Sequence, residues 1–121
     1  MPERAVEAAL KRPISEIKAE LFRALAHPAR IRALEVLANG ERSVGDLQPL
    51  VGIESSHLSQ QLGVLRRAGL VSTRKEGSSV IYGVRDPELV ELLSVAKRLL
   101  INSLTESTGL LKDLRTAARR S

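Results

Sequence analysis

The 121-residue sequence is long enough for one domain, and its hydrophobic content of 43% allows only a modest core. The chain holds one Phe, one Tyr and no Trp, so aliphatic side chains must build that core, which argues against a ligand cavity lined with aromatic rings. No cysteine is present, which excludes disulfides, thiolate metal ligands and a cysteine nucleophile.

Charge and hydropathy indicate the kind of partner and the compartment. A net charge of +5 and a pI of about 10.2 favour a nucleic acid or an anionic membrane surface as partner. No apolar run approaches the roughly 20 residues that a membrane span needs. The lack of cysteine and of a recognisable secretory signal predicts a cytoplasmic protein.

The N-terminal part of the chain is predicted to be helical. Residues 1–12 mix alanines and Leu10 with charges, which indicates a short helix that needs another element to pack on, for example from a second subunit. Pro13 interrupts the pattern, and a second helix is predicted from Ser15 to about Ala26. Its predicted inner face consists of Ile17, Leu21, Phe22 and Leu25.

A third helix is predicted to begin at His27-Pro28, because proline fits the first turn of a helix, and to end at Asn39-Gly40. Its predicted inward residues are Ile31, Leu34, Val36 and Leu37. His27 is a candidate metal ligand, but no second histidine lies three or four residues away. A capping or packing role is therefore the favoured interpretation of His27.

The stretch 42–71 predicts two short helices joined by a tight turn. Apolar residues recur every three or four positions in both halves: Val44, Leu47, Leu50 and Val51 in the first, and Leu58, Leu62 and Leu65 in the second. Ser43 is predicted to cap the first helix, Gly52 separates the two runs, and Gly69 is predicted to end the second helix.

The outer face of the second of these helices is polar and carries no acidic residue after Glu54. Serine contacts bases or phosphates, and glutamine pairs with adenine, when a helix lies in the major groove of DNA. The alternative is an ordinary solvated helix face. The predicted DNA contacts on this helix are Ser55, Ser56, His57, Ser59, Gln60 and Gln61, with Arg66 and Arg67 at its end.

A β-hairpin is predicted directly after this helix, the arrangement called a winged helix. Residues 70–75 alternate as in a strand, 76–79 form a turn-rich tip, and 80–84 favour a returning strand. The segment 55–85 holds five cations and one anion, a balance of +4, and such charge supplies affinity for phosphates. The predicted DNA contacts of the wing are Arg74, Lys75, Ser78, Ser79 and Tyr82.

A last long helix is predicted from Pro87 to about Ala117, weakened or bent at Gly109. Its apolar face is longer than the small core needs, so it is predicted to dimerise; the alternative is that it folds back on its own domain. A two-fold dimer would hold two recognition helices about 34 Å apart, one turn of DNA. The predicted dimer contacts are Leu10, Leu89, Leu93, Ala96, Leu100, Leu104 and Leu111.

The predicted fold is therefore mainly α with a small β-hairpin, a winged helix-turn-helix in one domain of residues 1–121. Its core is expected at 15–86, with the helix-turn-helix at 43–69 and the wing at 70–85. The segments 1–12 and 87–118 are expected to dimerise.

These elements, in this order, resemble the ArsR/SmtB family of bacterial winged-helix repressors over nearly the whole chain. The resemblance rests on LFRALAHPARIRALEVL (21–37), SVGDL (43–47), SSHLSQQLGVLRRAGLV (55–71) and RKEGSSVIYGVRDPEL (74–89). It implies a homodimer that binds a two-fold symmetric operator, usually as a repressor, and that often releases the operator when a metal binds.

The sequence departs from the family at both of its metal sites. The first site uses two cysteines, and the second uses an Asp and a His from one subunit with a His and a Glu or His from the other. The residues at these positions are Ser43 and Gly45 in the first site, and Asp86, Glu88, Leu99 and Asn102 in the second. Two carboxylates without an imidazole make a poor transition-metal site.

No cofactor is therefore predicted, and a divalent-metal site of oxygen ligands near Asp86 and Glu88 is the alternative. The signal is expected to be such a metal, a small molecule or a protein corepressor.

Two other functional classes compete with a sequence-specific DNA-binding regulator. A protein-docking or RNA-binding module would bind operator DNA no better than random duplex. An enzyme would depend on Ser56, His57 and Ser59, which are neighbours on one helix and do not face each other as nucleophile and base. The preferred prediction is therefore a transcriptional regulator that binds double-stranded DNA, and not an enzyme.

Overall fold

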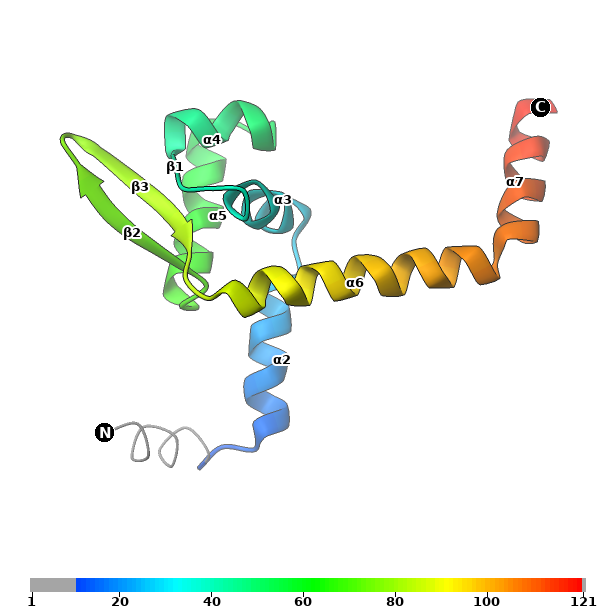
Figure 1. Cartoon of the computed structure of the whole chain (residues 1–121), viewed down its shortest axis with the longest axis horizontal. Helices are drawn as coiled ribbons and strands as arrows, with labels where there is room; N and C mark the ends of the chain where they lie inside the picture. Colours follow the sequence, from blue (N-terminus) through cyan, green and yellow to red (C-terminus); the bar gives the residue numbers. More distant parts are fainter. Residues whose placement is uncertain (1–10, 121) are drawn as a thin grey trace. The chain divides into compact units, whose positions relative to one another are not determined.

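The computed structural model describes residues 11–120, without the side chains at positions 110, 111 and 120. The chain divides into two units, Met1–Asp86 and Pro87–Ser121 (Figure 1). The predicted helix within residues 1–12, with Leu10, falls almost wholly outside the described residues.

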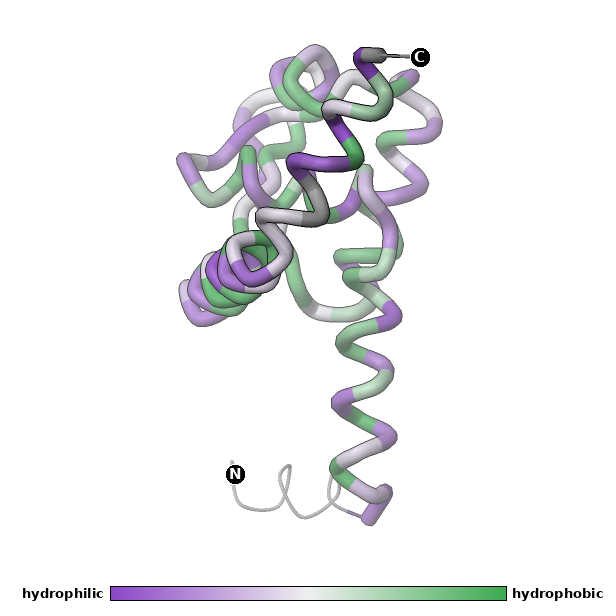
Figure 2. Tube along the Cα trace, turned by 90° about the vertical axis from the view of Figure 1, so that its right-hand side faces the viewer, coloured by the Kyte–Doolittle hydropathy of each residue, from purple (hydrophilic) through white to green (hydrophobic). Residues whose placement is uncertain are grey.

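Helix α2 spans Ile14–Leu25, one residue earlier at each end than predicted. Only its last turn is buried, while Ile17 and Leu21 are half-buried. Phe22 was predicted to face inward, but its side chain is 55% exposed. The prediction failed because α2 projects from the rest of its unit, so only its end is covered (Figure 1). Figure 2 shows hydrophobic and hydrophilic residues alternating along this projecting helix.

Helix α3 spans Pro28–Leu37 and begins at a histidine cap. The Nδ1 atom of His27 accepts a hydrogen bond from the backbone N–H of Ala29 at 3.0 Å, so of the two favoured roles, capping or packing, the structure shows capping. The predicted inward residues Ile31 and Val36 are only half-buried. The buried residues of this helix are Ala29, Ala33, Leu34 and Leu37.

Helix α4 spans Val44–Val51 and is the first helix of the predicted helix-turn-helix. The hydroxyl of Ser43 accepts a hydrogen bond from the backbone N–H of Asp46 at 3.2 Å, as predicted for an N-cap. The helix ends at Gly52, whose φ of 81° is a left-handed conformation that glycine adopts without strain.

The inner face of α4 is narrower than its sequence suggests. Leu47 and Val51 are buried, but Leu50, which was predicted to face inward, is 56% exposed. At 100° per residue, Leu50 lies about 80° around the helix from the midpoint of the other two, beyond the covered stripe.

Helix α5 spans Ser55–Arg67 and is the second helix of the predicted motif. Its leucines Leu58, Leu62 and Leu65 have no exposed surface, which confirms their predicted place in the core. The chain leaves the helix through Gly69, in a left-handed conformation with φ of 75°. Three fully buried leucines fix the rotation of α5 and therefore decide which of its side chains face outward.

A three-stranded antiparallel sheet in the order β1-β3-β2 completes the first unit. Its strands are β1 (Arg42–Ser43), β2 (Val71–Glu76) and β3 (Ser79–Val84). The register pairs Glu76 with Ser79, so the predicted wing closes in a two-residue turn led by Gly77, with φ of 62°. Strand β1 was not predicted, because two residues are too few to show an alternation and their partners on β3 lie far along the chain.

The second unit consists of α6 (Pro87–Glu106) and α7 (Thr108–Arg120), so the prediction of one long helix is wrong. The hydroxyls of Thr105 and Thr108 donate to helix carbonyls at 2.9 Å and 2.6 Å, and such bonds compete with the backbone ladder. Gly109, the predicted weak point, follows directly. Over residues 11–120, no helix is both long enough and apolar enough to cross a membrane.

Candidate nucleic-acid interface

The polar face of α5 lies opposite its buried leucines. At 100° per residue, Ser56 and Gln60 each lie about 160° around the helix from Leu58, and both are exposed. Gln61 lies nearer the core and is half-buried. The other predicted DNA contacts on this part of the helix, Ser55, His57 and Ser59, are exposed. The structure therefore presents a continuous polar surface that a DNA groove can approach.

Two side chains at the centre of this face differ in their hydrogen bonds. The hydroxyl of Ser56 donates to the carboxylate of Glu54, the residue before the first turn of α5. No side-chain hydrogen bond of Gln60 is found within the described part of the chain. An amide that is exposed and unengaged can offer both its donor and its acceptor to a base edge.

His57 contacts a residue that the sequence did not connect with it. Its ring meets the ring of His27 edge to face, with centroids 5.9 Å apart and an interplanar angle of 85°. The histidine that caps α3 therefore also touches the first turn of α5. Sequence reasoning missed this contact because the two residues are far apart in the chain.

Two predicted phosphate contacts, Arg66 and Arg67, lie in the last turn of α5 and are exposed. A methyl group at Gly63 would lie 3.2 Å from the Nη1 atom of Arg67, so this guanidinium lies back along the helix. Cations in a last turn also complement the negative end of the helix dipole. The exposure of both arginines is compatible with the predicted phosphate contacts, and their position also favours the helix itself.

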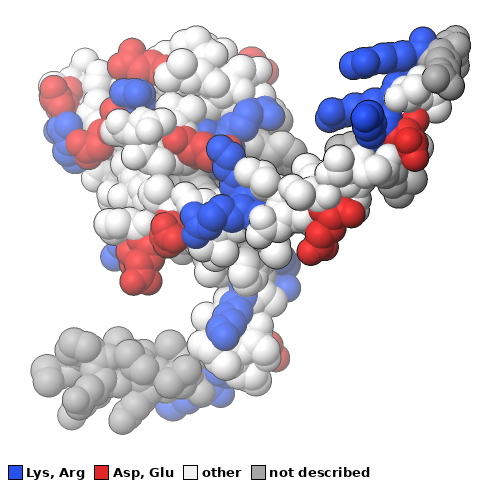
Figure 3. Space-filling view, turned by 45° about the vertical axis from the view of Figure 1, so that its right-hand side comes forward, with Lys and Arg blue, Asp and Glu red and all other residues white. Residues whose placement is uncertain are grey.

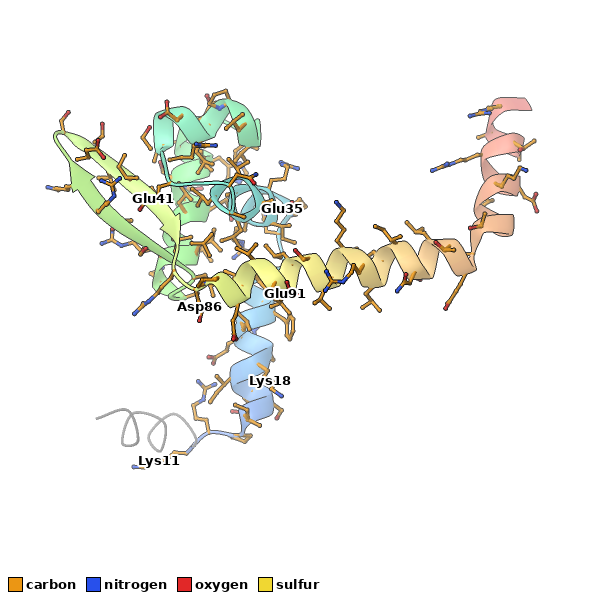
Figure 4. The ribbon with its side chains drawn as sticks, in the orientation of Figure 1. Lys11, Lys18, Glu35, Glu41, Asp86 and Glu91 are labelled. Carbon is orange, nitrogen blue, oxygen red and sulfur yellow. The ribbon has the colours of Figure 1, made fainter. Side chains whose placement is uncertain are left out.

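Arg74 of the wing is held by two carboxylates. Its Nη2 atom lies 3.2 Å from Oε1 of Glu41, and its Nη1 atom lies 2.7 Å from Oε2 of Glu76. The hydrogen bonds that Arg74 donates to Glu41, and then those to Glu76, raise the pKa of Arg74 above its ordinary value. A methyl group at Gly83 would lie 3.1 Å from Cγ of Glu41, so this carboxylate lies directly over β3, where Figure 4 shows it.

The pleat of the wing divides the predicted contacts between two faces. Neighbouring residues of a strand point to opposite faces, so Arg74 and Lys75 cannot meet the same surface. Lys75 pairs in register with Val80 and shares its face with Tyr82, which is half-buried. Ser78 and Ser79 are exposed at the tip.

The positive charge around the helix-turn-helix and wing is less continuous than the balance of +4 over residues 55–85 suggests. The balance over 55–85 omits Glu41, which the fold places beside Arg74. Figure 3 shows basic and acidic side chains interleaved on the visible face of the first unit. The wing therefore offers Lys75 as an exposed cation and Arg74 as a cation already paired.

Ser43, at one of the positions where the resembled family has a metal ligand, has another role in this structure. The hydroxyl of Ser43 caps α4. Asp86 lies between the end of β3 and the start of α6 (Figure 4). Over residues 11–120 no group of three or more His, Cys, Asp or Glu side chains is arranged to hold a metal ion.

The chain is similar to known proteins in both sequence and structure. The family model for "Bacterial regulatory protein, arsR family" matches residues 27–73, from the cap of α3 into β2. The HTH-type transcriptional regulator Rv0081 of Mycobacterium tuberculosis is 53% identical over 104 residues, 85% of this chain and 91% of its own. Its crystal structure matches with a TM-score of 0.74 and 52% identity, over 80% of this chain and 98% of that one.

Two further relatives have more specific descriptions. The biofilm growth-associated repressor of Agrobacterium fabrum is 41% identical over 93 residues, 77% of this chain and 71% of its own. The homodimeric winged helix-turn-helix DNA-binding domain of Mb0332 from Mycobacterium bovis matches with a TM-score of 0.68 and 27% identity, over 75% of this chain and 84% of that one.

These relatives are regulators of transcription and not enzymes, so the hypothesis of an enzyme using Ser56, His57 and Ser59 is rejected. The winged helix-turn-helix, the family match within it and the similarity to Rv0081 over most of both chains lead to one conclusion. This chain belongs to the arsR family of bacterial regulatory proteins and is a DNA-binding transcriptional regulator.

Proposed function

We propose that the chain acts as a homodimeric repressor that binds a two-fold symmetric operator. The observation that carries this proposal is the apolar surface of α6. Leu100 and Leu104, two of the predicted dimer contacts, are 63% and 53% exposed. Other large apolar side chains exposed on the same helix are Val95, Leu99 and Ile101. An apolar surface of this kind marks a contact with another protein, and a second copy of the chain supplies a matching one.

The predicted dimer contacts recur on one side of α6 at helical spacing. Leu89 is buried, Leu93 is half-buried and Ala96 is exposed, in line with Leu100 and Leu104 further on. The predicted contacts Leu10 and the side chain of Leu111 lie outside the described residues. The homodimeric domain of Mb0332 supports the same assembly, and the Agrobacterium repressor supports repression.

In the proposed complex α5 lies in the major groove and the wing meets the phosphate backbone. Gln60 and Ser56 contact base edges, since they project furthest from the buried side of the helix. Lys75 contacts phosphate as an exposed cation. A two-fold axis places the two recognition helices about 34 Å apart, so the operator consists of inverted half-sites one turn apart.

The proposed signal is a ligand that needs no cysteine. It is a divalent ion on oxygen ligands near Asp86 and Glu88, a small molecule, or a protein corepressor. A cytoplasmic location is part of the same proposal, because a bacterial regulator must reach the chromosome.

The test is a titration of the purified protein into the DNA upstream of its own gene, followed by fluorescence anisotropy at fixed salt, with a random duplex as control. Binding at about 10⁻⁸ M or tighter, and preferred over the random duplex, is expected. Equal binding to both duplexes would contradict the proposal and favour a protein-docking or RNA-binding module.

Repeating the titration with a panel of divalent metals tests the signal. A tenfold change with one metal, a coupling of about 1.4 kcal/mol, would identify a metal as the signal. Specific binding that no metal alters would leave a small molecule or a protein partner.

A further inference from the structure

Helix α7 carries a basic stripe that the winged helix does not use. Its members are Thr108, Lys112, Arg115, Thr116 and Arg119, which line one shallow hollow on the helix. Their spacing of four, three, one and three residues keeps them on a single face. Figure 3 shows basic side chains projecting together from this helix, at the upper right of the view. We call this set the α7 stripe.

Within the described part of the chain, the cations of the α7 stripe have no acidic partner. Lys112, Arg115 and Arg119 are exposed, and none forms an ion pair with any residue between 11 and 120. Asp113, the only acid of α7, lies about 100° around the helix from Lys112. Three exposed arginines elsewhere do have acidic partners: Arg12 with Glu20, Arg74 with Glu41 and Glu76, and Arg98 with Glu91.

Like charges three and four residues apart destabilise a helix, so the stripe weakens α7 in the free protein. An anion laid along it would remove that repulsion. The uncompensated charge therefore points to a bound anionic partner.

The hydroxyls of the stripe show that recognition would depend on charge. Thr108 donates to the carbonyl of Thr105 at 2.6 Å, and Thr116 donates to the carbonyl of Lys112 at 2.9 Å. Both hydroxyl protons are thus used in bonds to backbone carbonyls, and only the cations remain as donors. The stripe from Lys112 to Arg119 is about 10 Å long, whereas phosphates follow each other every ~3.4 Å of axis on one DNA strand. It is long enough to meet more than one phosphate.

DNA fits this helix better than a lipid surface does. Helices that lie on membranes carry Trp, Phe or Leu on the face opposite their cations. Helix α7 has leucines, of which Leu114 is 58% exposed, but no aromatic residue, because the single Phe and the single Tyr of the chain are Phe22 and Tyr82. The chain, moreover, already binds DNA as a member of its family.

We propose that the α7 stripe is a second phosphate-binding surface for duplex DNA, separate from the winged helix, that adds affinity without reading sequence. The proposal rests on the DNA binding of the family and not on the operator. Two parts of the chain then contribute separately to DNA binding. The winged helix supplies the sequence-specific part, and the α7 stripe supplies an electrostatic part.

The test is the triple variant Lys112→Gln, Arg115→Gln and Arg119→Gln, compared with wild type on a 60-base-pair random duplex between 50 and 300 mM salt. Each lost phosphate contact lowers the slope of log affinity against log salt by about 0.9, so a fall of up to about 2.7 is expected. The matched control Lys11→Gln, Lys18→Gln and Arg23→Gln makes the same change of net charge outside α7, and Lys11 and Lys18 are labelled in Figure 4. The control is expected to keep most of the slope.

Equal slopes for wild type and the stripe variant, or equal losses in both triple variants, would overturn the proposal. Loss of binding to phosphatidylserine vesicles with unchanged DNA slopes would assign the stripe to a membrane instead. The variant Arg115→Lys and Arg119→Lys keeps the positive charge and should therefore keep the salt slope of wild type. It shows whether substitutions in the α7 stripe act through lost charge or through misfolding of α7. Because the random duplex contains no operator, failure of the operator proposal leaves this comparison intact.

Discussion

The exposed side chains of α5 differ in what they already contact in the free protein. Ser56 donates to Glu54, and the ring of His57 meets that of His27. Gln60 has no such engagement within residues 11–120 and lies opposite the core. A side chain that gives up no internal contact gains more from a base edge, so Gln60 is the strongest candidate for direct readout.

Replacing Gln60 by Ala is expected to lower specific affinity by about 1–3 kcal/mol and to relax the preference at one base pair. Ser56→Ala is also expected to lower specific affinity, but by less. In the free protein the Ser56 hydroxyl already donates to Glu54, so the wild-type side chain gives up that hydrogen bond when it contacts a base. The measurement is anisotropy with the operator and with its single-base variants.

The matched control for this prediction is Gln61→Ala, the same change at a half-buried position on the flank of the helix. It should alter base preference less than Gln60→Ala. A larger change of preference at Gln61 would mean that α5 enters the groove with its flank, and the assigned roles would have to be exchanged.

At the scale of elements, the wing behaves as a sheet with two faces and not as a simple basic arm. Lys75 and Tyr82 share one face, while Arg74 lies on the other with Glu76 and Glu41. Arg74 must share or leave its carboxylates before it meets a phosphate. Its net contribution to DNA affinity is therefore expected to be smaller than that of Lys75, although its raised pKa keeps it charged.

The variant Glu41→Gln is expected to strengthen binding to all duplexes alike and to make the salt slope steeper, by up to about 0.9, because it frees Arg74 for a phosphate. Lys75→Ala should make the slope shallower by about the same amount. The measurement is the salt dependence of affinity for a random duplex.

The control for the wing is Glu35→Gln, which makes the same charge change at an exposed position of α3 (Figure 4). Any effect of overall charge appears in both variants. If Glu35→Gln steepened the slope as much as Glu41→Gln does, the restraint on Arg74 would have no part in DNA binding.

The C-terminal helices show how local hydrogen bonding decides where a helix ends. The apolar spacing continues past Glu106, which is why one helix was predicted. Thr105 and Thr108 instead bond to carbonyls of the preceding turn, and Gly109 adds little helix propensity. The spacing of apolar residues indicates which side of a helix is covered. It does not indicate where the helix is interrupted, as it is between α6 and α7.

At the scale of the whole molecule, the exposed leucines of α6 predict that two copies of the chain form a dimer. The double variant Leu100→Glu and Leu104→Glu is expected to reduce the mass in sedimentation from that of a dimer to the 13.2 kDa of one chain. Operator affinity should fall with it, because two linked half-sites bind far more tightly than one.

The control for assembly is Asn102→Glu, an exposed position about 160° around α6 from the predicted stripe. This variant should remain a dimer and keep its operator affinity. A double leucine variant that sedimented as a dimer would show that α6 is not the interface.

The winged helix-turn-helix, the outward face of α5, the cap at Ser43, the capping or packing role of His27 and the family could all be predicted from the sequence. These features depend on periodicity and on capping, which act between residues a few positions apart. The folded chain was needed to show that β1 joins the wing, that His27 meets His57, that Glu41 binds Arg74, and that Phe22 and Leu50 stay exposed. Each of these depends on which distant segments pack together, and no local pattern in the chain encodes that.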